Sequence, residues 1–364
     1  MPTIRSRGGK GAHVADDRTQ MTAPGQVGPG LPARERIVKW APLLVLMFLV
    51  LVFPVFEWLE DFRDGKDHIY LLDSRFLSIR NAARIAVAAT PALMIAIGVT
   101  FIIIMGSIDL SMEGTVSVCA VVFAFAFMAL GGTLASWAWL AIPLALLVGG
   151  IMGFINGLVH VRMKIPSFMA SLAMGFVGTG LALLLTGGDR VRVEDELFRS
   201  LLTVRLLNFP IMCYVAFAAL LFAWFIQSRT TLARNFYAIG GGEELAVASG
   251  LDVARVRILG FTLAGVFFAL GALMAVGRIG IAETVTGKDF MFISITAVVV
   301  GGTALWGGIG GVWNTLVGVL IVNVINNGMI VIGLPDFVQD GVLGVLVIIA
   351  VVLSTNRRTV SFVK

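Results

Sequence analysis

The sequence predicts an all-α fold, a polytopic membrane bundle of about ten transmembrane helices. Of the 364 residues, 58% are hydrophobic and only 13% are charged, whereas charged residues make up about a quarter of a soluble globular chain. Several uncharged stretches reach the roughly 20 residues that an α-helix needs to cross a bilayer. Cys119 and Cys213 lie inside apolar runs, so neither a disulfide framework nor a cysteine metal site is predicted.

Ten apolar segments are predicted to span the membrane, and the eighth and tenth are short for a full crossing. Short or glycine-interrupted spans are where transporters place broken helices and binding sites. The segments cover residues 40–56, 85–105, 112–130, 137–160, 168–186, 209–227, 258–278, 291–304, 313–331 and 341–354.

The two ends of the chain are predicted to be cytoplasmic tails. Residues 1–36 hold charged side chains among Gly, Pro, Thr and Gln, so they bury too little apolar surface to offset their ordering entropy and are expected to be disordered. A transmembrane domain follows over 37–356, with a tail over 357–364. With both termini inside, Lys and Arg are in excess over acids in the cytoplasmic segments. The formal net charge of +5 therefore needs no nucleic-acid partner.

An internal repeat is predicted from two similar stretches at the ends of the fourth and ninth spans. Ile155-Asn156-Gly157 precedes Ile165-Pro166, and Ile325-Asn326-Asn327-Gly328 precedes Leu334-Pro335. The copies are five helices apart, and an odd offset reverses their direction through the bilayer, as in inverted-repeat transporters. Alternatively, Asn, Gly and Pro recur at helix ends because they favour caps and turns.

The cytoplasmic loop 228–257 is predicted to contain a short helix. Gly240 to Gly242 are expected to interrupt the chain, Glu243 and Glu244 to begin the helix at the positive end of its dipole, and Gly250 to end it. Leu245 and Ala248 are three residues apart and form its apolar side. Such a helix has little to bury against except a partner protein, or it lies on the membrane surface.

Asp109 and Glu113 are the only acids predicted to lie close to the membrane interior. Asp109 or Ser111 is expected to cap the third helix, with Glu113 in the first turn against the dipole. Contact with a substrate and proton coupling are the alternative roles of these acids.

Four motifs resemble those of a known family, the sugar-type permease subunits of bacterial ATP-binding-cassette importers, typified by the ribose permease. They are Ile108-Asp109-Leu110-Ser111; Ile155-Asn156-Gly157 with Ile165-Pro166; the loop from Arg229-Thr230 to Gly250; and Gly301-Gly302-Thr303-Ala304 with Gly307-Gly308 and Asn326-Asn327-Gly328. The resemblance covers nearly all of residues 40–356. Each motif alone is weak, but their order and spacing together are specific.

The resemblance implies a multi-pass protein of the bacterial inner membrane that works with partner proteins. These are a second permease subunit, expected to make a homodimer, two cytoplasmic ATPase subunits and a periplasmic substrate-binding protein that delivers a monosaccharide. Residues 241–250 would be the coupling helix that docks on the ATPase. The residues carried over to this role are Gly241, Glu243, Glu244, Leu245, Ala248 and Gly250.

Polar and aromatic residues on the glycine-rich spans are the candidates for the substrate pathway. Buried amides can hydrogen-bond sugar hydroxyls, although Asn within a bundle also joins helices and Trp also anchors at the membrane interface. The candidates are Asn156, Trp306, Asn314, Asn323, Asn326 and Asn327.

Energy for transport is expected to come from outside the chain. The sequence has no Gly-x-x-x-x-Gly-Lys-Ser/Thr phosphate loop, so we expect a transport subunit that is not an enzyme, with ATP and Mg²⁺ on a partner and no cofactor or metal of its own. An ion-coupled secondary transporter is the alternative, and a channel is disfavoured.

The pair Glu113-Gly114 departs from the commonest form of the family motif and is similar to the pair in nucleoside-type relatives, so a nucleoside remains a candidate cargo.

The predicted orientation can be tested by cysteine labelling. In a background without the two native cysteines, Cys at Arg190 or Lys288 should react with an impermeant thiol reagent in intact cells. Cys at Arg162 or Arg234 should react only after the membrane is opened. Labelling of the second pair from outside would reverse the predicted topology.

Overall fold

The structure is a computed structural model that describes residues 33–63 and 74–335, and beyond them 338–339, 341–342, 344–345 and 348. The predicted tails and most of the tenth predicted span lie outside the described residues. The first helix begins at Ala33, ahead of the predicted tail boundary at residue 36.

Within the described chain, eight helices are long and apolar enough to cross a membrane, and each coincides with a predicted span. The short eighth span is also confirmed, because α11 (Phe290–Val300) has only 11 residues. The eight long helices are α1 (Ala33–Arg63), α2 (Ile79–Ile104), α3 (Met112–Ala129), α4 (Ala141–Arg162), which follows the 3-10 turn η2 (Trp137–Leu140), α5 (Ser167–Thr186), α7 (Ile211–Arg229), α10 (Val253–Ile279) and α12 (Val312–Val331). The all-α polytopic fold is therefore confirmed.

The remaining elements are short and lie between the long helices. They are α6 (Glu196–Thr203), α8 (Thr231–Gly241), α9 (Glu243–Ala248) and the two-residue strands β1 (Val191–Arg192), β2 (Arg205–Leu206), β3 (Phe209–Pro210) and β4 (Ile281–Ala282). β1 pairs antiparallel with β4, and β2 pairs antiparallel with β3. The first pair joins the segment after α5 to the end of α10.

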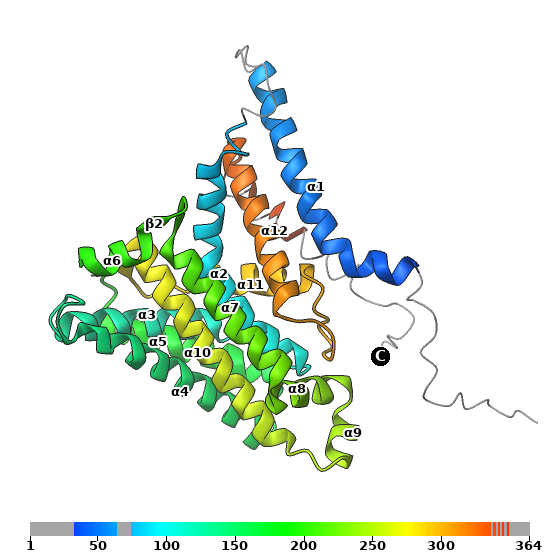
Figure 1. The fold of residues 1–364 in the computed structure, drawn as a ribbon. Helices are drawn as coiled ribbons and strands as arrows, with labels where there is room; N and C mark the ends of the chain where they lie inside the picture. Colours follow the sequence, from blue (N-terminus) through cyan, green and yellow to red (C-terminus); the bar gives the residue numbers. More distant parts are fainter. Residues whose placement is uncertain are drawn as a thin grey trace, which may run out of the picture. The chain divides into compact units, whose positions relative to one another are not determined.

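Helix α2 is the most enclosed of the eight long helices in the described bundle. Figure 1 shows it beside α7 and α12. In its most apolar stretch 89% of the residues are buried, because α10, α11, α12 and α7 all pack on it. A helix that is apolar all round is stable only when it is surrounded in this way or faces lipid. The Ser78 side chain caps its first turn by accepting a hydrogen bond from the backbone N–H of Asn81.

Helices α4 and α10 approach each other through a stripe of glycines. Gly149, Gly153 and Gly157 follow one another at four-residue spacing on one side of α4. A Cβ atom at Gly149 would overlap the carbonyl oxygen of Gly265, and one at Gly153 would overlap the carbonyl oxygen of Phe261. Small residues at such spacing let two backbones come close enough for extensive van der Waals contact, which drives helix association in lipid.

A second close approach joins α3 and α5. A Cβ atom at Gly114 would overlap the carbonyl oxygen of Gly175, and one at Gly178 would lie 2.5 Å from the Gly114 carbonyl carbon. The packing of α3 on α5 therefore explains the glycine at position 114, whatever the cargo. The Glu113-Gly114 pair is for this reason weaker support for a nucleoside cargo than the sequence alone suggested.

The glycine stripe predicts how single methyl groups act on stability. Gly153→Ala places a methyl group where the α10 backbone already lies, so α4 and α10 must separate, at a cost on the order of 1–3 kcal/mol. In Gly180→Ala on α5 nothing lies within 4 Å of the new Cβ, and alanine favours the helix. Thermal unfolding in detergent should show a lower midpoint for the first variant only. An unchanged midpoint for Gly153→Ala would contradict the packing.

Candidate functional site

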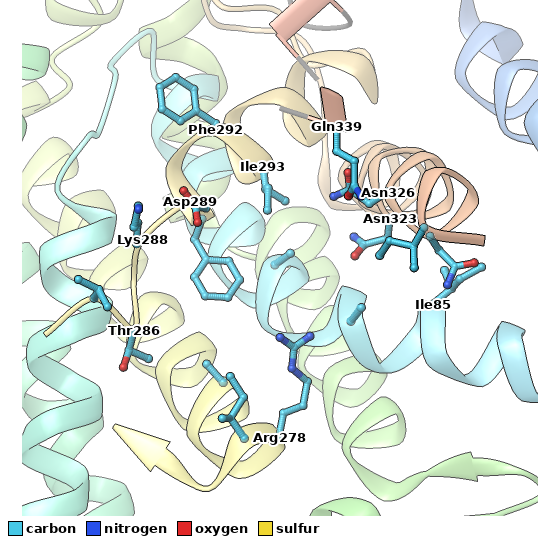
Figure 2. A pocket seen from close by; sticks show the side chains of 18 of the residues that line it. Ile85, Arg278, Thr286, Lys288, Asp289, Phe292, Ile293, Asn323, Asn326 and Gln339 are labelled. Carbon is cyan, nitrogen blue, oxygen red and sulfur yellow. The ribbon is translucent and has the colours of Figure 1, made fainter. Parts of the chain in front are cut away.

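A cavity of about 980 Å³ lies between α2, α10, α11 and α12, next to the segment that joins α10 to α11 (Figure 2). Its volume is in the range of small-molecule sites. Its wall is partly apolar, including Ile85, Phe292 and Ile293, and partly polar. By the predicted orientation it lies toward the outer side of the membrane.

Three of the six predicted pathway residues line this cavity, and all three are on the second half of α12. They are Asn323, Asn326 and Asn327. The Asn323 amide nitrogen donates to the Val319 carbonyl oxygen at 2.8 Å, which leaves its amide oxygen for another partner. No described residue forms a hydrogen bond with the Asn326 amide. These two amides are the ones available to a ligand.

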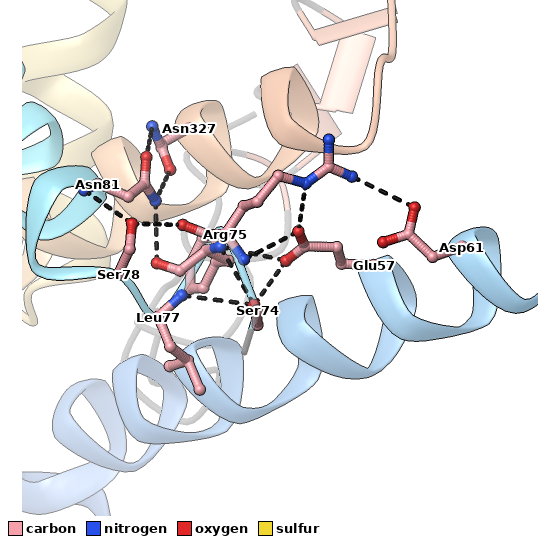
Figure 3. A network of polar contacts seen from close by, with 9 residues as sticks. Glu57, Asp61, Ser74, Arg75, Leu77, Ser78, Asn81 and Asn327 are labelled. Carbon is pink, nitrogen blue, oxygen red and sulfur yellow. Dashed lines mark hydrogen bonds and ion pairs between the residues drawn. The ribbon is translucent and has the colours of Figure 1, made fainter. Parts of the chain in front are cut away.

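Asn327 instead joins two helices. Its amide and that of Asn81 on α2 exchange hydrogen bonds of 2.7 and 3.1 Å, and Asn81 also donates to the Phe76 carbonyl oxygen (Figure 3). Such paired amides satisfy each other inside a bundle. For Asn327 the geometry favours the helix-joining alternative over direct contact with a substrate.

A buried carboxylate fixes the segment ahead of α2 to α1. Glu57, whose side chain is 4% exposed, accepts from the Ser74 hydroxyl, from the Arg75 backbone N–H and guanidinium, and from the Phe76 backbone N–H. Asp61, one turn further along α1, forms a second ion pair with Arg75 at 3.4 Å (Figure 3). With this many donors, both oxygens of the buried Glu57 carboxylate are satisfied as hydrogen-bond acceptors. This network positions the start of α2 and, through Asn81, the cavity face of α12.

The other three predicted pathway residues do not line the cavity. Trp306 and Asn314 belong to the other end of α12, where the glycine-rich loop 301–311 meets α8. The Gly308 N–H donates to the Ile104 carbonyl oxygen at 2.9 Å, and the Asn314 amide donates to the Gly301 carbonyl oxygen. Tyr237 on α8 donates to the Gly310 carbonyl oxygen at 2.7 Å. The motif therefore connects α8 with α2 and α12.

Asn156 belongs to a buried polar cluster with Asp109 and Ser111. The Asp109 carboxylate accepts from the Ser111 backbone N–H at 2.8 Å and from the Asn156 amide at 3.3 Å. Ser111 occupies the N-cap position of α3, and Glu113 lies in the first turn. The expected side-chain cap was wrong, because the Ser111 hydroxyl makes no cap hydrogen bond and accepts from the Asn156 amide at 3.4 Å instead. The cluster ties the loop before α3 to the middle of α4, away from the cavity lining.

The coupling segment contains the predicted short helix with a shifted start. Gly240 and Gly241 belong to α8, and the chain breaks only at Gly242; the expected interruption from Gly240 was wrong. The packing of α8 requires a glycine at this position, because a Cβ atom at Gly240 would overlap the Ile104 carbonyl oxygen. α9 then begins at Glu243, and Gly250 follows it with a φ of +84°, which suits glycine.

α9 is held on one side and uncovered on the other. Arg257 on α10 donates two hydrogen bonds, of 3.0 and 2.7 Å, to the Glu243 carboxylate. Ala246 is buried against the bundle, whereas the Leu245 side chain is 77% exposed, and Glu244 and Ala248 are exposed as well. The ion pair is bidentate, which fixes orientation as well as distance.

Three contributing residues were absent from the sequence candidates: Glu57, Asn81 and Arg278. Glu57 and Asn81 act through partners distant in the chain, so no local pattern marks them. Arg278 does have a signal, since it is a single cation in the last turn of a 27-residue apolar helix. Intramembrane or interfacial ionisable residues are expensive and often functional.

The fold and site define a multi-pass membrane transport subunit. Residues 81–351 match the family described as "Branched-chain amino acid transport system / permease component", and the chain belongs to this family. The predicted resemblance to sugar-type permease subunits is confirmed by similar proteins.

The ribose import permease protein RbsC of Haemophilus influenzae is 31% identical over 79% of this chain and 88% of its own length. The L-arabinose ABC transporter permease protein AraH of Azospirillum brasilense is 28% identical over 93% and 96%. The galactose/methyl galactoside import permease protein MglC of Salmonella typhimurium is 31% identical over 79% and 90%. No solved structure matches the chain significantly.

The Asp109 cluster predicts opposite effects of two substitutions. Asp109→Asn keeps an oxygen that can accept from Ser111 and Asn156, so the protein should fold normally. Asp109→Leu leaves those two buried donors without an acceptor, at about 1–3 kcal/mol each. Monodispersity and thermal midpoint in detergent measure the difference. If the Asn variant folded normally but no longer transported, the charge would have a functional role beyond structure.

Proposed function

We propose that the chain is the permease subunit of an ATP-driven importer for a monosaccharide. It would pair with a second permease subunit, with two cytoplasmic ATPase subunits that bind ATP and Mg²⁺, and with a periplasmic protein that delivers the sugar. Its family and the ribose, arabinose and galactose permeases among its relatives support this proposal. The chain itself would be no enzyme and would need no cofactor.

The observation that carries the proposal is the exposed apolar side of α9. Leu245 is 77% exposed and lies on a helix of six residues. The Arg257–Glu243 ion pair fixes this helix, so the leucine side chain has a defined position on the cytoplasmic face of the predicted topology. Preorganised apolar residues of this kind dock into pockets of partner proteins. An ATPase groove is the partner that an importer requires at this position.

The site and the docking surface lie at opposite ends of α10. α9 precedes its first residue, Val253, and Arg278 in its last turn lines the cavity. A helix of 27 residues is about 40 Å long at 1.5 Å per residue. A rigid helix of this length would carry movement at the ATPase contact to the cavity.

The proposed setting is the bacterial inner membrane with both termini in the cytoplasm. The residues ahead of Ala33 would be a dispensable tail, the chain from α1 to residue 356 the permease domain with its coupling loop 228–257, and 357–364 a short second tail. Asn323 and Asn326 would contact the sugar as it passes, since their amides can bond hydroxyl groups.

Leu245→Arg tests the coupling role. A charge in the docking groove would be buried without a partner, so the ATPase should no longer copurify with the permease and ATP-driven uptake should fall at least tenfold. The matched control is Leu207→Arg, which changes a leucine that is 81% exposed in the β2–β3 turn. That variant should retain the ATPase.

Both variants should reach the membrane in normal amounts, because each new side chain stays solvated in the isolated permease. Uptake that persists in Leu245→Arg without bound ATPase, and that collapses when a protonophore or sodium ionophore is added, would contradict the importer. It would support the ion-coupled carrier instead.

A further inference from the structure

Among the described residues that line the cavity, cations outnumber acids. Arg190 forms an ion pair of 2.8 Å with Glu283, so these two residues compensate each other. Arg278 takes part in no ion pair or hydrogen bond with any described residue, yet it lines the cavity and is exposed within it. Figure 2 shows its side chain extending from the end of α10 toward the middle of the cavity lining.

The other charged groups of the lining add to the excess of positive charge. Arg84 and Lys288 are cations, and Asp289 is the one acid besides Glu283 among the described lining residues. Figure 2 shows Lys288 and Asp289 side by side at the start of α11, apart from Arg278. Asp289 is therefore placed to offset Lys288 and not Arg278.

A guanidinium that has no acidic partner among the described residues favours an anionic ligand. Arginine offers a planar set of donors that matches a carboxylate in a bidentate manner, and such charge-assisted hydrogen bonds are about twice as strong as neutral ones. The cavity is also lined by the Asn323 and Asn326 amides, which can form hydrogen bonds with hydroxyl groups, and by the Phe292 ring. The lining thus combines one anion-binding group with two groups for hydroxyls.

We infer that the cavity is a transit site for an acidic monosaccharide, with Arg278 binding the sugar carboxylate and Asn323 and Asn326 binding its hydroxyl groups. This inference rests on the proposed function and goes beyond the neutral sugars that name the relatives. A carboxylate also explains why an arginine is used where a neutral amide would serve a neutral sugar.

Uptake by cells that contain the complete importer provides the test, with pairs of labelled sugars that differ by one carboxylate. The pairs are galacturonate with galactose, ribonate with ribose, and arabinonate with arabinose. The acidic member of at least one pair should be preferred. Arg278→Gln should lower its uptake about ten- to hundredfold, as expected for the loss of a hydrogen-bonded charge, while Arg278→Lys should retain an intermediate rate.

Arg192→Gln is the matched control, because it removes a cation from the neighbouring β1 strand at a side chain that is 71% exposed and outside the cavity lining. It should leave uptake unchanged. Exclusive uptake of neutral sugars, or an equal loss of both members of a pair in Arg278→Gln with normal membrane expression, would overturn the inference and leave the proposed function intact. An assembled importer that takes up no monosaccharide at all, neutral or acidic, would overturn the proposed function itself, and this inference with it.

Discussion

The close packing of α4 on α10 is the contact on which the rest of the structure depends. In lipid no hydrophobic effect pushes two apolar helices together, so their association relies on van der Waals contact over a well-matched surface. Gly149 and Gly153 of α4 provide that surface, because neither has a Cβ atom that would separate the two backbones. α10 also packs on α2, the most enclosed helix. A shift of α10 therefore moves both the wall of the cavity and the base of α9.

The same helix connects two regions of different chemistry. At its first residues the Arg257–Glu243 ion pair holds α9 with Leu245 uncovered. At its last turn Arg278 extends into a cavity whose opposite wall carries Asn323 and Asn326. Because a continuous helix transmits displacement along its axis, a movement of α9 and a movement of the cavity wall at Arg278 would be linked mechanically.

Several polar groups inside the bundle occur in small sets that bond each other, although Asp109 and Asn156 each keep one buried oxygen without a partner. Asn81 pairs with Asn327, Asp109 with Asn156, and Glu57 with the backbone ahead of α2. Unpaired polar groups in a membrane interior are costly, so each set also fixes the register of the elements that carry it. An asparagine in an apolar helix therefore has two possible uses, and only its neighbours in space decide between them.

The sequence by itself determined the class of fold, the spans that lie within the described residues, the short α11 and the short helix that starts at Glu243. These follow from the length of apolar runs and from helix-end chemistry within a few residues. It also identified the amide-rich half of α12. Only the tertiary structure decided that Asn323 and Asn326 face a cavity, that Asn327 is bound to α2 and Asn156 to the loop before α3, and that Gly240 continues α8. It alone singled out Arg278. These outcomes depend on which side chains meet across helices far apart in the chain, and local periodicity holds no information about such pairings.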